Sequence, residues 1–325
     1  MAGLPEAWKL QPQDRLAIFD KEIAPHELQP YLHLHHRDDG KRPVAVLIVG
    51  QTGAGKTRLA PDLTKAMVDG NRTPAHFIAD TYKTYHPHYA ECLEKAPEKA
   101  SVLAGLDARI WLTMACEYAA DQRLDVLAES ACRHPDDFCD LAELFHKRDY
   151  NVRVAILAVP EALSRLGILV RYYRNLPEAQ SRNLPLRLTP KKVHDDSYAG
   201  LALAASFIDQ NPVADAVIVV RRNNMLAYKN ERAATTASGG TRAWQADAGA
   251  SRSLEIERTR PLSLEEKRTA ESDIEELKKL HDPKVDVQIR EIEGYLASLA
   301  AGSDSGQPLL PPLEPLDAAK KYQKR

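Results

Sequence analysis

The chain has 325 residues, 44% of them hydrophobic, and a formal net charge of −2 at pH 7. This length allows one sizeable core with a smaller appendage. No apolar run approaches the about 18 residues that a bilayer-crossing helix needs, and the first residues lack the basic and apolar segments of a signal peptide. We therefore expect a cytoplasmic protein without a membrane partner. The near-neutral charge also gives no global attraction to nucleic acid.

The cysteines show no metal-binding or disulfide spacing. None of the four belongs to a CxxC pair, and a reducing cytosol keeps such residues as thiols. We expect four free thiols, at Cys92, Cys116, Cys132 and Cys139.

The predicted elements alternate along most of the chain. Residues 1–40 are predicted to form an N-terminal helical segment. Short apolar strands are then predicted at 44–49, 76–79, 124–128, 152–159 and 216–220. Helices are predicted at 57–67, 101–120, 161–173 and 197–209. This alternation predicts an α/β core over residues 41–230, a doubly wound and mostly parallel sheet with flanking helices.

The composition changes after the core. Residues 231–300 are predicted to form a linker and a helical C-terminal extension, with a loop at 235–252 and helices at 262–280 and 285–299. Residues 301–325 are rich in proline and end in basic residues, so we expect a poorly ordered tail.

The clearest motif follows the first predicted strand. Residues 50–57 read Gly-Gln-Thr-Gly-Ala-Gly-Lys-Thr and match GxxxxGK[ST] at every position. We call them the phosphate loop. The nucleotide-binding candidates are Gly50, Gln51, Thr52, Gly53, Ala54, Gly55, Lys56 and Thr57.

Each residue type in the phosphate loop suits a phosphate ligand. Glycines let successive N–H groups point inward at phosphate oxygens, and the following helix adds its positive N-terminal end. Lys56 can reach the β- and γ-phosphates, and Thr57 offers a hydroxyl to Mg²⁺. The motif therefore predicts ATP and Mg²⁺ as cofactors, although a GTPase or a motor would carry the same loop.

Asp80 follows the second predicted strand. Ligands of doubly wound sheets lie at the carboxyl ends of the strands, so this carboxylate could act as a general base on an acceptor hydroxyl. An aspartate at that place also suits a helix N-cap. Spacing alone leaves both interpretations open.

Several motifs in order resemble the zeta toxins, the kinase half of epsilon–zeta toxin–antitoxin systems. Asp80 leads into Tyr-Lys-x-Tyr-His-Pro-x-Tyr, residues 129–133 read Glu-Ser-Ala-Cys-Arg, and an apolar strand ends in Ala-Val-Pro at 158–160. Leu-Gly at 166–167 and Arg-Leu-Thr-Pro at 187–190 follow. The resemblance covers roughly residues 43–228, more than half of the chain.

This resemblance implies a P-loop kinase fold and a specific reaction. Zeta toxins phosphorylate a UDP-activated amino sugar, typically UDP-N-acetylglucosamine, at its 3′-hydroxyl. By the same resemblance Asp80 is the catalytic base, Lys56 and Thr57 hold phosphate and Mg²⁺, and Arg171 and Arg187 embrace the transferred phosphoryl group. A small helical antitoxin that obstructs the ATP site is the expected protein partner.

The sequence departs from the family on the acceptor side. Thr113 occupies the place where the family usually has a glutamate that contacts the amino sugar, and Ile78 replaces an acidic residue before the base. Glu129 could hold Mg²⁺ through water or position the acceptor, or it could cap the next turn; Arg133 has a similar pair of interpretations. Kinase activity is thus better supported than the identity of the acceptor.

Two alternative functions remain open. A kinase of another small molecule or of a nucleic-acid end would keep the phosphate loop and Asp80 but change the acceptor pocket. The 6% aromatic content and the near-neutral charge disfavour a nucleic-acid groove. The other alternative is a non-catalytic nucleotide-binding interaction protein that uses the helices predicted at 262–299.

Overall fold

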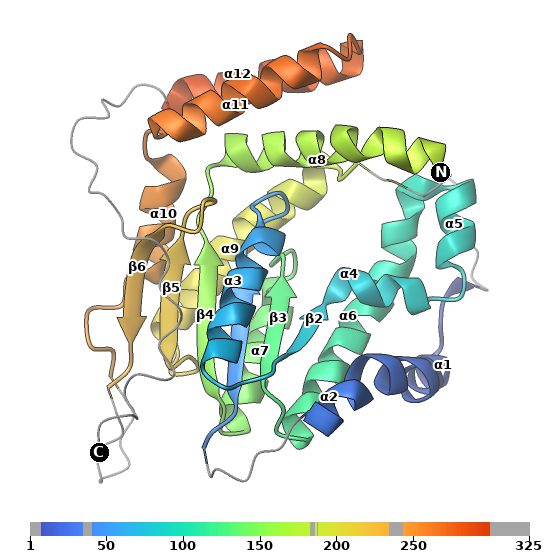
Figure 1. The fold of residues 1–325 in the computed structure, drawn as a ribbon, viewed down its shortest axis with the longest axis vertical. Helices are drawn as coiled ribbons and strands as arrows, with labels where there is room; N and C mark the ends of the chain where they lie inside the picture. The colour runs from blue at the N-terminus through green and yellow to red at the C-terminus, as the bar shows by residue number, and fades with distance from the viewer. Residues whose placement is uncertain (1–7, 35–40, 183–185, 187, 234–242, 300–325) are drawn as a thin grey trace.

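The computed structural model describes residues 8–34, 41–182, 186, 188–233 and 243–299 (Figure 1). Within them the sheet has six strands in the order β2-β3-β1-β4-β5-β6, and β6 alone is antiparallel to its neighbour. The strands are β1 Val44–Val49, β2 Ala75–Ile78, β3 Val126–Ser130, β4 Asn151–Leu157, β5 Ala216–Val220 and β6 Leu226–Glu231. The predicted α/β fold with a mostly parallel sheet is confirmed.

The central strands are buried on both faces, which explains their apolar runs. All six residues of β1 are buried, and four of them are valine or isoleucine, whose β-branched side chains pack well on a pleated surface. Ala45, Leu47 and Val49 belong to the core on one face, whereas Val44, Val46 and Ile48 belong to the core on the other. The side-chain period of two thus divides β1 between two cores.

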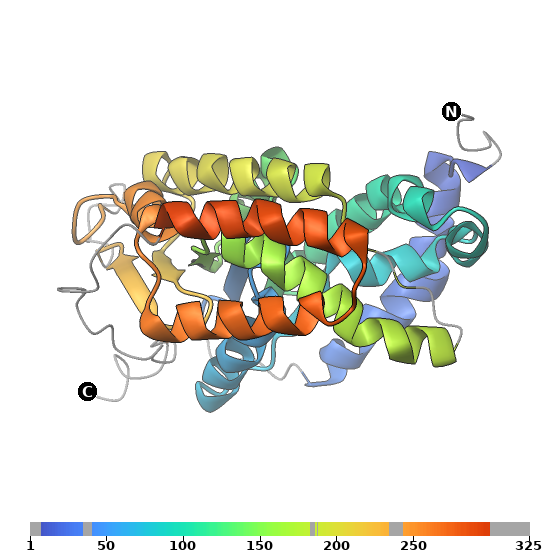
Figure 2. The same ribbon diagram turned by 90° about the horizontal axis from the view of Figure 1, so that it is seen from above.

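Helices cover both faces of the sheet. One face carries α6 Pro97–Asp121, α7 Pro135–Lys147, α9 Lys191–Gln210 and α10 Ala250–Thr259. The other face carries α3 Lys56–Asp69, α8 Glu161–Ser181, α11 Leu264–Lys278 and α12 Pro283–Leu299. Seen from above, α11 and α12 lie side by side over α8, so the predicted C-terminal helices pack onto the core (Figure 2).

The chain before β1 packs against α6. It forms α1 Pro12–Ile18, the π-helical η2 Phe19–Leu28 and α2 Gln29–Leu34. The buried Trp111 indole of α6 donates to the Arg15 carbonyl oxygen at 3.0 Å. Between β2 and α6 the chain forms α4 Ala79–Tyr82, η3 Lys83–Tyr85 and α5 Tyr89–Lys95.

Some boundaries differ from the predictions. The predicted strand at 124–128 begins two residues later, as β3 Val126–Ser130, so Glu129 lies within the strand rather than after it. The sequence did not predict β6, α7 or α10. Strand β6 is a half-buried edge strand with charged residues, and such edges give a weak hydrophobic pattern. The predicted loop at 235–252 falls partly outside the described residues, as does the predicted tail at 301–325, and α10 begins at Ala250.

The structure also bears on the state of the cysteines and on membrane-spanning helices. All four cysteines are free thiols. In the described part of the chain, no helix has the length and apolarity that crossing a membrane requires.

Candidate active site at the phosphate loop

The phosphate loop joins β1 to α3 and depends on its glycines. Gly53 and Gly55 have φ values of 82° and 109°, in the left-handed region that favours glycine. Gly53 also lies against α8, where an added Cβ would overlap the Ser164 carbonyl oxygen and approach Ile168 Cγ1 to 2.9 Å. Only glycine fits the position at which the loop meets α8.

The donor groups of the loop fit a polyphosphate with its metal ion. Lys56 Nζ donates to the Gly50 carbonyl oxygen at 2.7 Å, which holds the ammonium group over the loop. Burial lowers the pKa of Lys56, and the negative charges of Glu129 and Asp80 oppose this effect. Thr57 lies exposed in the first turn of α3, where its hydroxyl is open to a Mg²⁺ ion.

Gln51 supports the loop from behind. Its side chain is fully buried, and Nε2 donates to the Val159 carbonyl oxygen at 2.7 Å. Gln51 Oε1 accepts a hydrogen bond from Arg258 Nη2 of α10 at 3.2 Å. Because its side chain faces the interior, any contact of Gln51 with a nucleotide would come from its backbone.

Asp80 lies in the first turn of α4, just beyond β2. The N-cap of α4 is Ile78, so the N-cap interpretation of Asp80 is wrong. The side chain of Asp80 is 81% exposed, and Oδ1 lies 2.6 Å from Lys83 Nζ. Desolvation raises the pKa of Asp80, but the charges of Lys83, Lys56 and Arg171 outweigh this and lower the pKa below its ordinary value. Asp80 is therefore ionised at neutral pH.

Glu129 and Arg171 complete a charged group around Lys56. Glu129 is 7% exposed in β3, opposite Ile78 of β2, and its Oε1 lies 3.0 Å from His76 Nε2. Arg171 is exposed on α8, and its charge reaches both Lys56 and Asp80. The structure thus brings Asp80, Glu129 and Arg171 within electrostatic reach of Lys56.

Two other predicted site residues, Thr113 and Arg133, have different partners. The Thr113 hydroxyl, exposed on α6, donates back to the Arg109 carbonyl oxygen at 3.2 Å, an ordinary contact for threonine in a helix. Arg133 Nε lies 3.7 Å from Asp196 Oδ2. Arg187 lies outside the described residues.

The sequence did not single out three residues beside the loop. His76 and Lys83 are the partners of Glu129 and Asp80 described above. Arg222 follows β5, donates to the Leu163 carbonyl oxygen at 2.8 Å and lies against Gly55 and Gly167. Its place beyond the carboxyl end of a parallel strand was the available signal.

One side-chain cluster has the composition of a metal site but already holds a cation. Ligand atoms of Glu161, His194 and Asp195 lie within 4.8 Å of one another. Arg165 Nη2 bridges the two carboxylates, at 2.7 Å from Glu161 Oε1 and 2.6 Å from Asp195 Oδ1. The cluster is an ion-pair network between α8 and α9.

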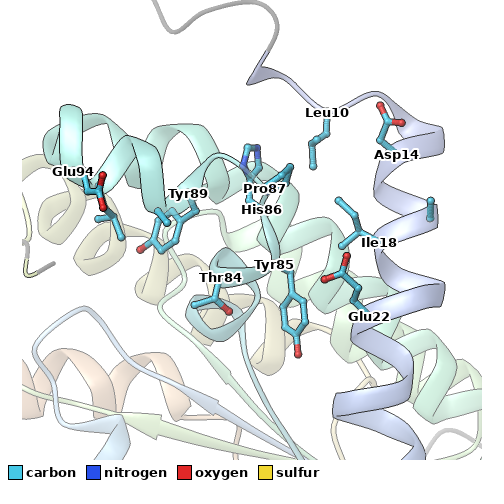
Figure 3. A pocket seen from close by; sticks show the side chains of 13 residues that line it. Leu10, Asp14, Ile18, Glu22, Thr84, Tyr85, His86, Pro87, Tyr89 and Glu94 are labelled. Carbon is cyan, nitrogen blue, oxygen red and sulfur yellow. The ribbon is translucent and has the colours of Figure 1, made fainter. Parts of the chain in front are cut away.

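A separate groove opens between the N-terminal segment and α5 (Figure 3). Its volume is about 1120 Å³, and the described residues that line it include Asp14, Glu22 and Glu94 but neither lysine nor arginine. Tyr85 lies at its edge, with its hydroxyl 2.6 Å from Glu27 Oε1. Carboxylates without cations repel a polyphosphate, so the groove does not suit a nucleotide.

Known proteins resemble this chain in sequence and fold. The zeta toxin family model matches residues 32–233. Toxin PezT of Streptococcus pneumoniae is 26% identical over 212 residues, 62% of this chain and 78% of that protein. Toxin zeta of Streptococcus agalactiae is 31% identical over 156 residues, 47% of this chain and 51% of that protein.

The fold comparison agrees. A solved structure from the PezAT chromosomal toxin–antitoxin system of Streptococcus pneumoniae has a TM-score of 0.63 at 17% identity, over 85% of this chain and 100% of that chain. With more than half of its length matched by the family model, the chain belongs to the zeta toxin family.

Proposed function

We propose that the protein transfers the γ-phosphoryl group of ATP to the 3′-hydroxyl of a UDP-activated amino sugar, UDP-N-acetylglucosamine. The observation that carries the proposal is the ionised Asp80 beside Lys56 and Arg171, at the carboxyl ends of parallel strands next to a phosphate loop. Phosphoryl transfer requires a general base for the acceptor hydroxyl and positive charges that stabilise the transferred phosphoryl group.

Each residue has one task in the proposed reaction. ATP with Mg²⁺, when bound, supplies the phosphoryl group and the ADP that leaves. Asp80 accepts the proton of the acceptor hydroxyl while that oxygen bonds to phosphorus. Lys56, Arg171 and Arg187 stabilise the charge on the transferred group, and Thr57 offers its hydroxyl to Mg²⁺. Glu129, held by His76, is available for a water of the metal ion or for the acceptor.

The test is phosphorylation of a nucleotide sugar followed by mass spectrometry. The protein is incubated with ATP, Mg²⁺ and UDP-N-acetylglucosamine, beside a panel of other nucleotide sugars. We expect one added phosphoryl group with the wild type and a rate about 10²–10⁴-fold lower with Asp80→Asn. Asp69→Asn, an exposed carboxylate at the far end of α3, is the matched control and should react like the wild type. ATP turnover without a modified sugar would refute the acceptor.

A second acceptor class is favoured by one observation. Thr113 and Ile78 replace acidic residues that the family usually carries on the acceptor side. A kinase of another small molecule would keep the phosphate loop and Asp80 while lacking those contacts. The nucleotide-sugar panel separates the two candidates, and Thr113→Glu should shift preference toward UDP-N-acetylglucosamine if this position contacts the sugar.

The expected protein partner is a small helical antitoxin. The similar structure from Streptococcus pneumoniae belongs to a toxin–antitoxin system. We propose an equivalent partner that covers the ATP site of this chain. Such a partner should abolish ATP binding when it is added in equimolar amount, and unchanged ATP binding in a stable complex would contradict the proposed mode of inhibition.

A further inference from the structure

Arg258 of α10 reaches the underside of the phosphate loop from a part of the chain beyond the family match, which ends at residue 233. Its Nη2 donates to Gln51 Oε1 at 3.2 Å, across 207 positions of sequence. Its guanidinium lies over the Tyr198 ring, with 3.6 Å between Cζ and the ring centroid. The contact therefore joins α10 to the candidate nucleotide site.

Arg258 is a buried cation without a carboxylate partner among the described residues. It is 8% exposed, and its Nε has no hydrogen-bond partner. Burying an unpaired charge is unfavourable. Proteins carry such unfavourable features mainly at functional sites. Burial raises the pKa of the Cys132 thiol, and the positive charges of Lys56 and Arg258 oppose this effect, so both cations lie within electrostatic range of the same thiol.

The surroundings of Arg258 fix it in place. The first two N–H groups of α10 donate to the Asp209 carboxylate at 3.0 and 2.9 Å. Near the other end, Glu257 accepts from Arg221 Nε at 2.6 Å and from Arg260 Nε at 2.6 Å. Because these contacts hold both ends of α10, Arg258 is kept within hydrogen-bond distance of Gln51.

Gln51 passes this constraint to the loop. Its amide nitrogen is bonded to the Val159 carbonyl oxygen while its amide oxygen is bonded to Arg258, so the side chain is fixed at both atoms. The next residue, Thr52, donates its N–H to Ser197 Oγ at 3.2 Å. The first half of the loop is thus held from behind, and the direction of its N–H groups depends on that support.

We infer that Arg258 is a positioning residue that holds the phosphate loop in its nucleotide-binding form, and that α10 is therefore a component of the ATP site. The inference rests on the ATP-binding part of the proposed function and is independent of the acceptor. Arg258 acts through Gln51 rather than by touching the nucleotide.

The test measures ATP binding by calorimetry on the full chain with Mg²⁺ and no acceptor. Arg258→Ala should raise the Kd for ATP by about tenfold, the effect of losing one hydrogen bond to a charged group. Arg252→Ala is the matched control, because Arg252 is an exposed arginine on the same helix, and its Kd should equal that of the wild type. Thermal unfolding without nucleotide separates lost affinity from lost stability.

A double-mutant cycle with Gln51→Ala tests whether Arg258 acts on the phosphate loop through Gln51. If Arg258 acts through Gln51, the two substitutions together should raise Kd by less than the product of their separate effects. Should Arg258→Ala fail to fold, Arg258→Lys keeps the charge and the stem but loses the flat stack, and a smaller rise in Kd is expected.

Wild-type Kd in the folded variants would overturn the inference, as would fully independent effects in the cycle. A wild-type protein that binds ATP yet modifies no nucleotide sugar would instead refute the proposed acceptor, without contradicting the role of Arg258. A wild type that binds no ATP would overturn both.

Discussion

Gly53→Ala adds one methyl group where the phosphate loop meets α8. The added Cβ would overlap the Ser164 carbonyl oxygen and lie 2.9 Å from Ile168 Cγ1, and the φ of 82° is one that alanine avoids. The left-handed backbone costs roughly 1–2 kcal/mol, and forced overlap in a packed region costs about 1–3 kcal/mol. The sum is about 2–5 kcal/mol, divided between global stability and displacement of the loop.

Two assays on the same samples separate these terms. Urea unfolding gives the stability change, and calorimetry with ATP and Mg²⁺ gives the affinity. If about 2 kcal/mol appears as loop displacement, the Kd for ATP rises roughly thirtyfold. Gly105→Ala on α6 is the control, since an added Cβ there meets nothing within 4 Å, and it should gain about 0.5–1 kcal/mol of stability. A Gly53→Ala protein with wild-type stability and wild-type Kd would refute this account of the loop.

Two further predictions concern pH. Lys83→Met removes the positive charge that lowers the pKa of Asp80 most, so the pKa of Asp80 should rise. The acid limb of the pH–rate profile should then move to higher pH, and an unmoved limb would contradict the pairing of Lys83 with Asp80. Burial holds the pKa of His194 below its ordinary value of 6.5, despite the opposing Asp195 carboxylate. Protonation therefore favours the unfolded chain, and stability is lost as pH falls below about 6.5. Thermal unfolding of His194→Gln should fall less steeply from about pH 7.5 to 5, and parallel curves for variant and wild type would count against the prediction.

Local signals in the sequence were sufficient for the centre of the fold. The continuous apolar run of β1, the glycines after it and the helix that follows are neighbours along the chain, so their pattern is visible without tertiary information. The phosphate loop and its flanking elements were predicted on that basis. The charged strand β6 was missed because pairing with β5, rather than its own pattern, makes it a strand.

The interior of the site depends on contacts that no local pattern reveals. Gln51 was predicted as a nucleotide-binding residue from its place in the motif, but its side chain serves Val159 and Arg258 instead. For Asp80 the sequence left a general base and an N-cap equally open, and only the backbone of α4 removed the second. The role of Asp80 as a base stays a prediction until it is measured.

The cover that α11 and α12 give to α8 bears on where the protein can be divided. The family match ends at residue 233, yet the cluster that buries α8 continues beyond it. It includes Leu262 and, in the last two helices, Ala270, Ile274, Leu277, Val285, Ile289 and Ile292. A chain that ends at residue 233 would expose a broad apolar face of α8 to water, and exposed apolar surfaces of this kind promote aggregation. The border of the family match and the border of a stably folding unit thus differ in this molecule, and recombinant versions should extend to residue 299 to keep that face covered.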